Sequence, residues 1–380
     1  MRICIVYDHL YPATIGGGER WLHDLAVALA AEGHAVTYLT MTHWDTDPPV
    51  LPGVEIVGLV PAGAVYAGER RAFGPPLRFG LAVWRYLRSH GRRFDVVHVA
   101  AFPFLPMLGV ALARRRSEYR LVGDWFEVWT RHYWRRYAGS LGTAGWLLQR
   151  ACVRVQHHAF CNSEHTRRRL VEEGFSGTAE VLPGLYAGPV EPSSSSDVEP
   201  LVVYAGRHVK EKRVGLLVEG FARARGELPE LRLELYGDGA DRVEAERVVE
   251  ALAMGDAVSF EGRRTQHDVE SAFARAACVA TASEREGYGL IVVEAAARGT
   301  PSVVVAGEQN AAVELVAEGV NGAIAAEPTP ESIGAAITRA VRAGSVLRET
   351  TAGWFAANAD ALRIERSLEL VTASYARSMT

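Results

Sequence analysis

The chain has 380 residues, of which 48% are hydrophobic, so it is long enough for two domains and has the composition of a soluble globular protein. The formal net charge of −4 gives no general bias toward nucleic acid, and no apolar run reaches the length of a membrane span. Four scattered cysteines without CxxC spacing indicate reduced, buried thiols, and Met1 leads directly into an apolar strand. We therefore expect a cytoplasmic protein without a signal peptide and without a nucleic-acid partner.

A glycine-rich loop connects the first two elements. Residues 2–7 predict a strand, residues 8–19 a loop that contains Gly16 and Gly17, and the following amphipathic helix ends at Gly33 before a strand at 34–40. This is a βαβ unit, in which the backbone N–H groups of the two glycines are expected to approach a diphosphate. The GxGxxG spacing of dinucleotide-binding proteins is absent, and a plain flexible turn is the alternative.

Further strands are expected at 54–60 and 94–99, with an amphipathic helix at 77–90 between them. Two features of this part resemble chemical sites but favour a structural interpretation. Asp45 and Asp47 form an Asp-x-Asp pair in a proline-rich loop that nothing holds in place, so we expect no metal there. His98 lies in the middle of a strand, where a packed core histidine is the commoner case.

Six aromatic residues gather between residues 125 and 137, just after a strand that begins near residue 119. Aromatic rings can stack on sugars or cover a lipid, but a helical hairpin whose aromatics are core explains the pattern equally well. Residues 114–154 hold nine arginines and three acidic residues, so this face is basic. Such a face suits an anionic membrane surface, and an ordinary solvated surface is at least as common.

A serine- and proline-rich run at 188–197 is the clearest linker in the chain. It is preceded by a strand that leads into a capped helix at 159–166. Beyond it a second α/β pattern begins, with strands expected at 201–205, 232–236, 257–260 and 301–306, helices expected at 214–224 and from residue 311, and helical sequence from 354 to 380.

Basic residues follow the first strand of this second half. Gly206 and Arg207 begin the loop, and Lys212 lies just before the expected helix at 214–224. Cations near a helix start are placed to neutralise a diphosphate, although solvated surface charge is the alternative. Gly237 and Gly262 follow the next two strands.

Two glutamates flank the most informative stretch. Glu286 follows an apolar strand at 278–283, and Glu294 lies about one turn inside an expected helix at 290–298. Gly287 and Gly289 between them allow the backbone to approach a ligand closely. Glu294 is suited to accept hydrogen bonds from a ribose, and Glu286 from a hexose. Two solvated surface glutamates are the alternative.

Taken in order, these motifs resemble the retaining glycosyltransferases of family 4. The resemblance covers nearly the whole chain and rests on the glycine loop at 16–19, the basic loop at 206–212, Gly237-x-Gly239, Phe260-x-Gly262 and Glu286-x7-Glu294. It implies the GT-B fold, which is two tandem Rossmann-like doubly wound domains with an interdomain cleft. We therefore predict an acceptor-binding domain at 1–187, a linker at 188–200, a nucleotide-sugar domain at 201–353 and a terminal helix at 354–380 that crosses back.

The resemblance also implies roles for individual residues. Arg207 and Lys212 would hold the donor diphosphate in place of a metal, so neither metal nor cofactor is expected. Glu294 would hold the ribose, and Glu286 the hexose near the reacting carbon. The donor-binding set would be completed by Gly16, Gly17, Gly206, Gly237, Gly262, Gly287, Tyr288, Gly289 and Leu290. The implied reaction moves a hexosyl group from a UDP- or GDP-sugar to a glycan, lipid-linked or small-molecule acceptor with retention of anomeric configuration.

The aromatic segment departs from the family pattern, because Phe126 stands where many members have histidine. This removes any histidine-assisted role there and predicts an unusual acceptor or sugar. The candidate acceptor-binding residues are Asp124, Trp125, Phe126 and Trp129. Contact of the basic first domain with the inner face of a membrane is a further expectation. A non-catalytic nucleotide-sugar-binding subunit and a sugar-nucleotide epimerase of the same fold remain the alternatives, and the missing GxGxxG argues against an oxidoreductase.

Overall fold

The computed structural model describes residues 1–14, 16–63, 66–67, 70–71, 74–189 and 198–376. The chain forms two compact units, which are Met1–Leu185 with Glu365–Thr380 (unit 1) and Tyr186–Ile364 (unit 2). Most of the predicted linker, residues 190–197, and the last four residues of the predicted terminal helix lie outside the described residues.

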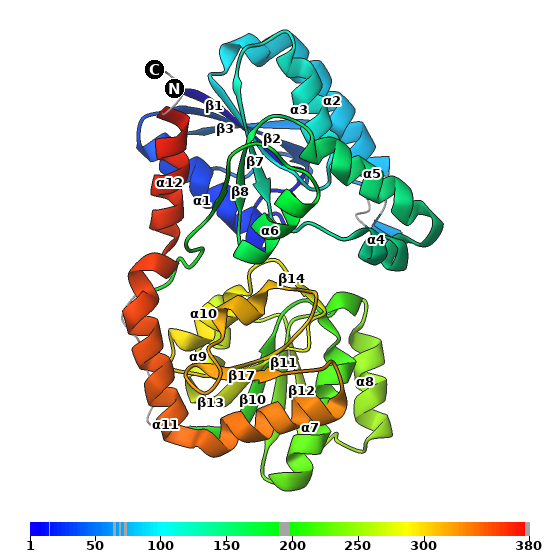
Figure 1. Cartoon of the computed structure of the whole chain (residues 1–380), viewed down its shortest axis with the longest axis vertical. Coiled ribbons are helices and arrows are strands. Elements are labelled where there is room, and N and C mark those ends of the chain that lie inside the picture. The colour runs from blue at the N-terminus through cyan, green and yellow to red at the C-terminus, as the bar shows by residue number, and fades with distance from the viewer. Residues whose placement is uncertain (15, 64–65, 68–69, 72–73, 190–197, 377–380) are drawn as a thin grey trace. The chain divides into compact units, whose positions relative to one another are not determined.

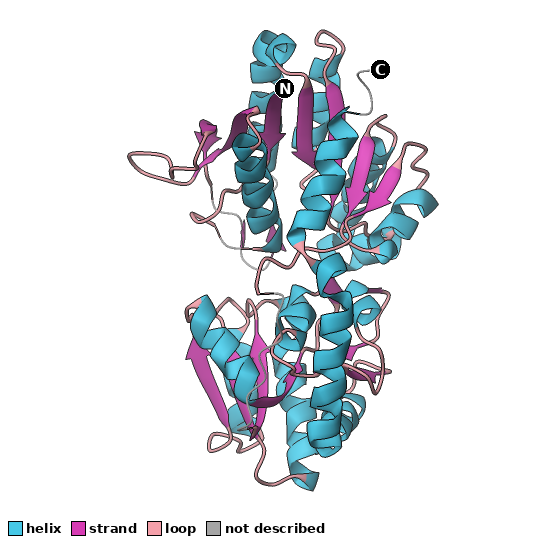
Figure 2. Cartoon of the chain, turned by 90° about the vertical axis from the view of Figure 1, so that its left-hand side faces the viewer, coloured by secondary structure: helices cyan, strands magenta, loops and turns pink. Residues whose placement is uncertain are grey.

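Unit 1 is built on a seven-stranded parallel sheet with helices on both faces (Figures 1 and 2). The strand order is β3-β2-β1-β6-β7-β8-β9. Its central strand β6 is buried at every residue, as expected for a parallel sheet covered on both sides. The strands are β1 (Arg2–Val6), β2 (Ala35–Thr42), β3 (Val54–Pro61), β6 (Val96–Ala100), β7 (Arg120–Trp125), β8 (His158–Cys161) and β9 (Ala179–Val181), with a separate antiparallel pair β4 (Tyr66–Ala67) and β5 (Arg70–Arg71).

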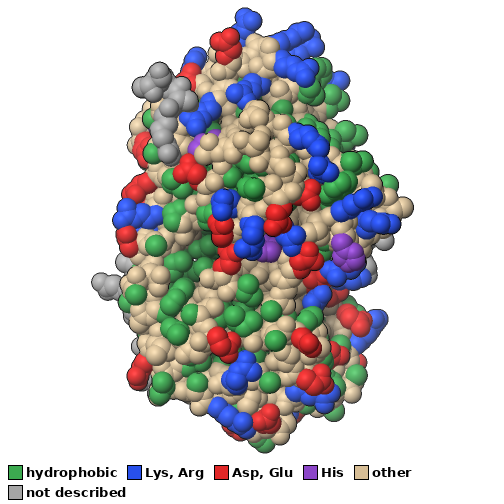
Figure 3. All heavy atoms as spheres, in the orientation of Figure 1, with side chains coloured by type: hydrophobic (Ala, Val, Ile, Leu, Met, Phe, Trp, Pro, Cys, Tyr) green, Lys and Arg blue, Asp and Glu red, His purple; other side chains and the backbone are tan. Residues whose placement is uncertain are grey.

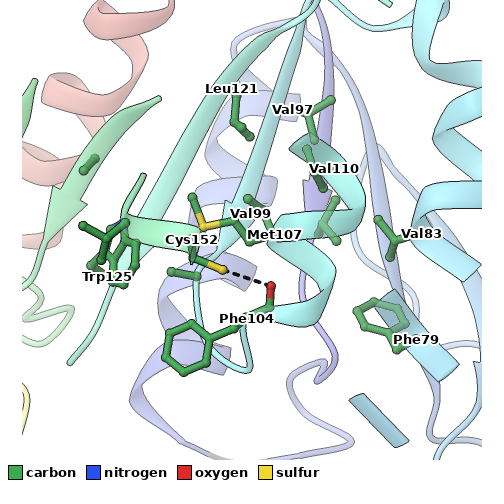
Figure 4. Close-up of a cluster of buried hydrophobic side chains, with 14 of the residues drawn as sticks. Phe79, Val83, Val97, Val99, Phe104, Met107, Val110, Leu121, Trp125 and Cys152 are labelled. Atoms are coloured by element: carbon green, nitrogen blue, oxygen red, sulfur yellow. Dashed lines mark hydrogen bonds between the residues drawn. The ribbon is translucent and has the colours of Figure 1, made fainter. Parts of the chain in front are cut away.

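Apolar helix faces pack on this sheet. The helices are α1 (Gly17–Ala31), α2 (Gly74–His90), α3 (Leu105–Arg114), α4 (Arg131–Ala138), α5 (Gly142–Val153), α6 (Glu164–Glu172) and most of α12 (Ile364–Ala376). Figure 4 shows part of the core, where Cys152 Sγ donates to the carbonyl of Phe104 at 3.3 Å. All four cysteines are free and buried, which confirms the prediction of buried thiols. Helix α3 was not predicted because Pro103 and Pro106 suggest a break, but Pro106 falls in the first turn, where proline is tolerated.

Unit 2 repeats the plan with a six-stranded parallel sheet in the order β12-β11-β10-β13-β15-β17. The strands are β10 (Glu199–Ala205), β11 (Arg232–Tyr236), β12 (Val258–Gly262), β13 (Ala276–Ala280), β15 (Ser302–Val305) and β17 (Gly322–Ala325), and the two-residue strands β14 (Arg285–Glu286) and β16 (Gln309–Asn310) pair with each other. The helices are α7 (Val214–Glu227), α8 (Arg242–Ala251), α9 (Gln266–Arg275), α10 (Leu290–Ala296) and α11 (Pro330–Leu362). The predicted pair of Rossmann-like α/β halves is thereby confirmed.

Two predicted helices differ from the structure. The helix expected from residue 311 is a 3-10 turn, Ala311–Leu315, because Val316 adopts an extended conformation that ends it. The terminal helical sequence forms two helices and begins at Pro330. Gly344 (φ 55°) interrupts α11, and Arg363 (φ −67°, ψ 141°) separates it from α12.

A buried polar network joins four elements of unit 1. Asp124 at the end of β7 accepts a hydrogen bond from Trp21 Nε1 of α1 at 2.7 Å, and its other oxygen lies 2.8 Å from His98 Nε2 of β6. The second ring nitrogen of His98 is 2.5 Å from the hydroxyl of Tyr375 on α12. His98 and Asp124 are both 0% exposed, so His98 is the core histidine that the sequence predicted. The network ties the last helix to the centre of the sheet.

We expect Tyr375→Phe to lower the free energy of unfolding of unit 1 by about 1–3 kcal/mol, since it leaves a buried ring nitrogen of His98 without its partner. The urea unfolding midpoint measures this. Tyr86→Phe in α2 is the matched control, because its hydroxyl bonds to no residue that the structure describes. Equal midpoints for the two variants would contradict the role of the network.

Candidate functional site

Three glycines meet at the carboxyl edge of the unit 2 sheet. The N–H of Gly206 donates to Tyr236 O at 3.0 Å, and the N–H of Gly237 donates to Gly262 O at 2.8 Å. Gly237 has φ 116°, and a Cβ atom there would lie 1.9 Å from the carbonyl oxygen of Gly206. The predicted residues Gly206, Gly237 and Gly262 therefore form one continuous backbone surface. A side chain at position 237 would clash with it.

Lys212 and Glu286 form an ion pair at this edge, with 2.5 Å between Nζ and Oε1. Lys212 lies on a 3-10 turn (Lys210–Lys212) after β10, and Glu286 lies on β14 after β13. Their side chains are 20% and 15% exposed, so the pair is partly screened from solvent but remains reachable. The structure thus brings together two residues that the sequence analysis assigned to separate parts of one ligand.

Two more ion pairs flank the first one. Arg213 lies 2.9 Å from Glu284, and Arg285 lies 2.8 Å from Glu211, while the N–H of Glu284 donates to Glu211 O. We call residues 211–213 with residues 284–286 the ion-pair ladder. The outer pairs were not predicted from the sequence. Their signal is the complementary order of charges, Glu-Lys-Arg in one loop and Glu-Arg-Glu in the other.

Gly289 opens α10 from a left-handed conformation, φ 99°, with its Cβ position 2.5 Å from Ala312 Cβ. Tyr288 before it is buried, and Leu290 after it is half-buried. Glu294 lies one turn into this seven-residue helix and is half-buried, with its Oε1 3.5 Å from Gln266 Nε2. The segment Gly287–Glu294 is therefore held by the unit 2 core, and the carboxylate of Glu294 stays accessible.

Arg207 is exposed, and its side chain makes no hydrogen bond or ion pair with any residue that the structure describes. Its carbonyl accepts a hydrogen bond from the Tyr204 hydroxyl at 3.0 Å, and burial raises the pKa of that phenol, so it stays neutral. Next to it, His208 is 0% exposed, and burial lowers the pKa of its ring, with the charge of Arg242 adding to the effect. The loop thus combines an exposed cation, Arg207, with a buried imidazole whose pKa is lowered.

The predicted unit 1 residues meet in a separate place. Gly16 precedes α1 in extended backbone, and a Cβ atom would meet nothing within 4 Å at Gly17. At Gly18 a Cβ atom would lie 2.9 Å from the ring of Phe126. The glycine loop and the aromatic segment, which the sequence analysis considered separately, are therefore neighbours.

Three of the four predicted acceptor-binding side chains lie inside the core. Asp124 is 0%, Trp125 1% and Trp129 5% exposed. Trp125 donates to His157 Nε2 at 2.9 Å, and Trp129 packs on Trp134. Phe126 alone of the four is half-exposed. The aromatic cluster is thus mainly a structural core, because its rings pack on one another and their indole N–H groups donate hydrogen bonds to internal acceptors.

Within the described ranges, no group of three His, Cys, Asp or Glu residues is arranged to hold a metal ion. None of the helices that the structure describes is long and apolar enough to cross a membrane.

Two family models match the two halves of the chain. Residues 15–184 match the model described as Glycosyltransferase Family 4, and residues 191–351 match Glycosyl transferases group 1. A glycogen synthase of Mycobacterium tuberculosis is 25% identical over 337 residues, which are 80% of this chain and 77% of that protein. The GtfA subunit of a UDP-N-acetylglucosamine–peptide N-acetylglucosaminyltransferase from Streptococcus parasanguinis is 28% identical over 45% of this chain. The matched region is about a third (34%) of that relative's length.

Solved structures share the fold. A sucrose-phosphate synthase of Thermosynechococcus elongatus superimposes with a TM-score of 0.83 at 19% identity, covering 99% of this chain and 98% of that chain. The Anabaena protein HepE in complex with UDP gives 0.74 at 17% identity, with 98% and 99% covered. The arrangement of two Rossmann-like domains is therefore the GT-B fold.

We expect Gly237→Ala to displace the Gly206 loop and to lower the stability of unit 2 by about 1–3 kcal/mol, because it combines strain at positive φ with a clash against backbone. Thermal unfolding measures the loss. Gly226→Ala in α7 is the control, since its Cβ atom would meet nothing within 4 Å and alanine there favours the helix. A Gly237→Ala protein as stable as the control would show that the loops are not packed in this way.

Proposed function

Because the chain belongs to the family 4 type of glycosyltransferases, with the GT-B fold, we propose that it is a retaining hexosyltransferase that works without a metal ion. Its donor is a UDP- or GDP-sugar, and its acceptor is a hydroxyl of a glycan, lipid-linked or small-molecule substrate. The observation that carries the proposal is the ion pair of Lys212 and Glu286 at the carboxyl edge of the unit 2 sheet.

The ion pair supports the proposal that a diphosphate is bound without a metal. A donor diphosphate carries two negative charges, and Lys212 offers it a charge-assisted hydrogen bond. The side chain of Arg207, which is exposed in the same loop, supplies a second cation. As Lys212 turns to the phosphate, Glu286 is released from the pair and its carboxylate becomes an acceptor for sugar hydroxyls. Donor binding thereby exchanges one internal ion pair for two contacts with the donor.

The remaining donor contacts follow from the same edge. Glu294 accepts hydrogen bonds from the hydroxyls of the ribose. The backbone from Gly287 to Leu290, at the start of α10, faces the phosphate and the sugar. The nucleoside lies against the backbone surface that Gly206, Gly237 and Gly262 form. Gly16 and Gly17 complete the proposed donor contacts from unit 1. A Cβ atom at Gly17 would meet nothing within 4 Å, whereas one at Gly16 would lie 2.3 Å from Glu19 Oε2.

The transfer exchanges one bond at the anomeric carbon and moves one proton. The bond between the anomeric carbon and the diphosphate oxygen breaks, and a bond from the acceptor oxygen forms on the same face, so configuration is retained. The proton of the acceptor hydroxyl passes to an oxygen of the departing diphosphate, and the products are the glycoside and a nucleoside diphosphate. Lys212 and Arg207 stabilise the charge that grows on the leaving group, and Glu286 orients the sugar.

We expect Glu286→Gln to keep nucleoside diphosphate binding and to lose sugar transfer by at least about a hundredfold, because the neutral amide keeps the shape but not the charge near the reacting carbon. Release of nucleoside diphosphate from a panel of UDP- and GDP-sugars measures turnover, and thermal shift measures binding. Glu244→Gln, exposed on α8, is the matched control. Normal transfer by the Glu286 variant would refute its role.

Lys212→Ala should instead weaken nucleoside diphosphate binding, by about tenfold or more for a lost charge-assisted contact. The thermal shift that UDP or GDP gives should be insensitive to EDTA. A shift that EDTA abolishes would refute the metal-free part of the proposal, and binding without turnover of any donor by the unmodified chain would favour a non-catalytic subunit.

A lipid surface is the partner that we propose for the α4–α5 hairpin of unit 1. Residues 128–163 contain five arginines and no acidic residue. Arg131, Arg135 and Arg136 are exposed on α4, and Leu141 and Leu147 beside them are each 55% exposed. Figure 3 shows basic and histidine side chains gathered where Figure 1 places α4. Exposed cations with adjacent apolar side chains suit an anionic membrane surface.

Vesicles test this contact. The chain should co-sediment with phosphatidylglycerol vesicles at low salt and not with phosphatidylcholine vesicles, and the double variant Arg135→Gln/Arg136→Gln should bind about tenfold more weakly. Arg247→Gln, exposed on α8 of unit 2, serves as the control. If the unmodified chain stays in solution with phosphatidylglycerol at low salt, the hairpin does not bind lipid.

A further inference from the structure

Four rings form a row along the carboxyl edge of the unit 1 sheet. Phe126 follows β7, Tyr7 and His9 follow β1, and His43 follows β2. Successive ring centroids are 6.3 Å apart from Phe126 to Tyr7, 5.7 Å from Tyr7 to His9 and 5.3 Å from His9 to His43. We call these residues the ring row. Phe126, Tyr7 and His43 are half-exposed, and His9 is 9% exposed.

Backbone contacts hold the ring row in place. The carbonyl of His9 accepts a hydrogen bond from the buried hydroxyl of Tyr38 at 3.2 Å. At the other end of the row, Phe126 and Tyr7 pack against Gly18. A Cβ atom at Gly18 would lie 2.9 Å from the Phe126 ring and 3.3 Å from the Tyr7 hydroxyl, so a larger residue would displace them. The row is therefore built into the ends of three strands and the start of α1, and it does not depend on a long loop.

The ring of His43 has a defined tautomer. Its Nε2 lies 2.7 Å from the carbonyl oxygen of Asp8, and a carbonyl oxygen can only accept, so Nε2 carries the proton. In the neutral ring Nδ1 then keeps a lone pair, and it makes no hydrogen bond to any part of the chain that the structure describes. His43 thus presents a fixed acceptor atom at the end of the row, and a hydroxyl is its natural partner.

Neighbouring rings lie edge to face from Phe126 to Tyr7 (75°) and from Tyr7 to His9 (81°). We propose that the ring row is a saccharide subsite, in which the acceptor sugar packs against the half-exposed rings and donates a hydroxyl hydrogen bond to His43 Nδ1. This inference rests on the proposed transferase function and names its acceptor class. Aromatic rings supply apolar area with a defined geometry, and the row contains no fixed positive charge that would favour a phosphate-bearing acceptor. His43 accordingly acts as a specificity-determining residue for a neutral, sugar-terminated acceptor.

The test uses the full chain and methyl glycosides of glucose, galactose, mannose and N-acetylglucosamine as probes. At least one glycoside should shift the ¹⁵N signal of His43 Nδ1 in NMR spectra, and His43→Phe, which keeps a ring but lacks the acceptor nitrogen, should bind that glycoside about five- to tenfold more weakly. His90→Phe is the matched control, because the His90 ring also bonds a carbonyl, that of Tyr86 at 3.0 Å, and stacks on an aromatic ring.

Competition identifies the source of the sugar. If a nucleotide sugar displaces the glycoside and the corresponding nucleoside diphosphate does not, the row binds the donor sugar and the inference is wrong. It is also wrong if no glycoside shifts the His43 signal, or if His43→Phe and His90→Phe bind alike. Thermal stabilisation by UDP or GDP in the same samples separates these results from a failure of the proposed function, which would remove that stabilisation as well.

Discussion

The pairing of Lys212 with Glu286 is the interaction on which the candidate site depends. Each residue belongs to a different loop, and the two outer pairs of the ion-pair ladder fix those loops against each other. Without its partner, either side chain would be a partly desolvated charge with no opposite charge beside it. Together the two side chains have no net charge until a ligand separates them. The outer pairs thus fix both loops, so that ligand binding needs to reorient only the side chains of Lys212 and Glu286.

Much of the unit 2 site could be predicted from the sequence, because its residues lie in short motifs directly after apolar strands. Gly206 and Gly237 each follow a strand and Gly262 ends one, and in a parallel sheet such positions share one edge. The outer pairs of the ladder could not be predicted in this way. Glu211 and Arg285 are 74 residues apart, and nothing local to either loop shows how the two loops align.

The aromatic segment shows the opposite case, in which composition left a binding surface and a structural core equally open and packing favours the core for Trp125 and Trp129. Trp125 and Trp129 have internal partners for their indole N–H groups, so burying them costs little. Asp124 is buried because His98 and Trp21 approach its two oxygens from other elements. Only the long-range fold shows this, since β6, β7 and α1 are far apart in sequence. Helix periodicity likewise could not reveal the break at Arg363, where a residue without any special propensity turns extended.

The break at Arg363 also bears on how the chain folds as it is made. Tyr186 and Arg363 form a bridge, and Gly184 bonds with Ser367, so the chain leaves unit 1 and returns to it at neighbouring points. Unit 2 is in effect an insertion within unit 1. A ribosome therefore completes all of unit 2 before it supplies the helix that carries Tyr375. During synthesis unit 2 can close its core at once, while unit 1, although its strands emerge first, must wait with His98 uncovered until α12 has been made.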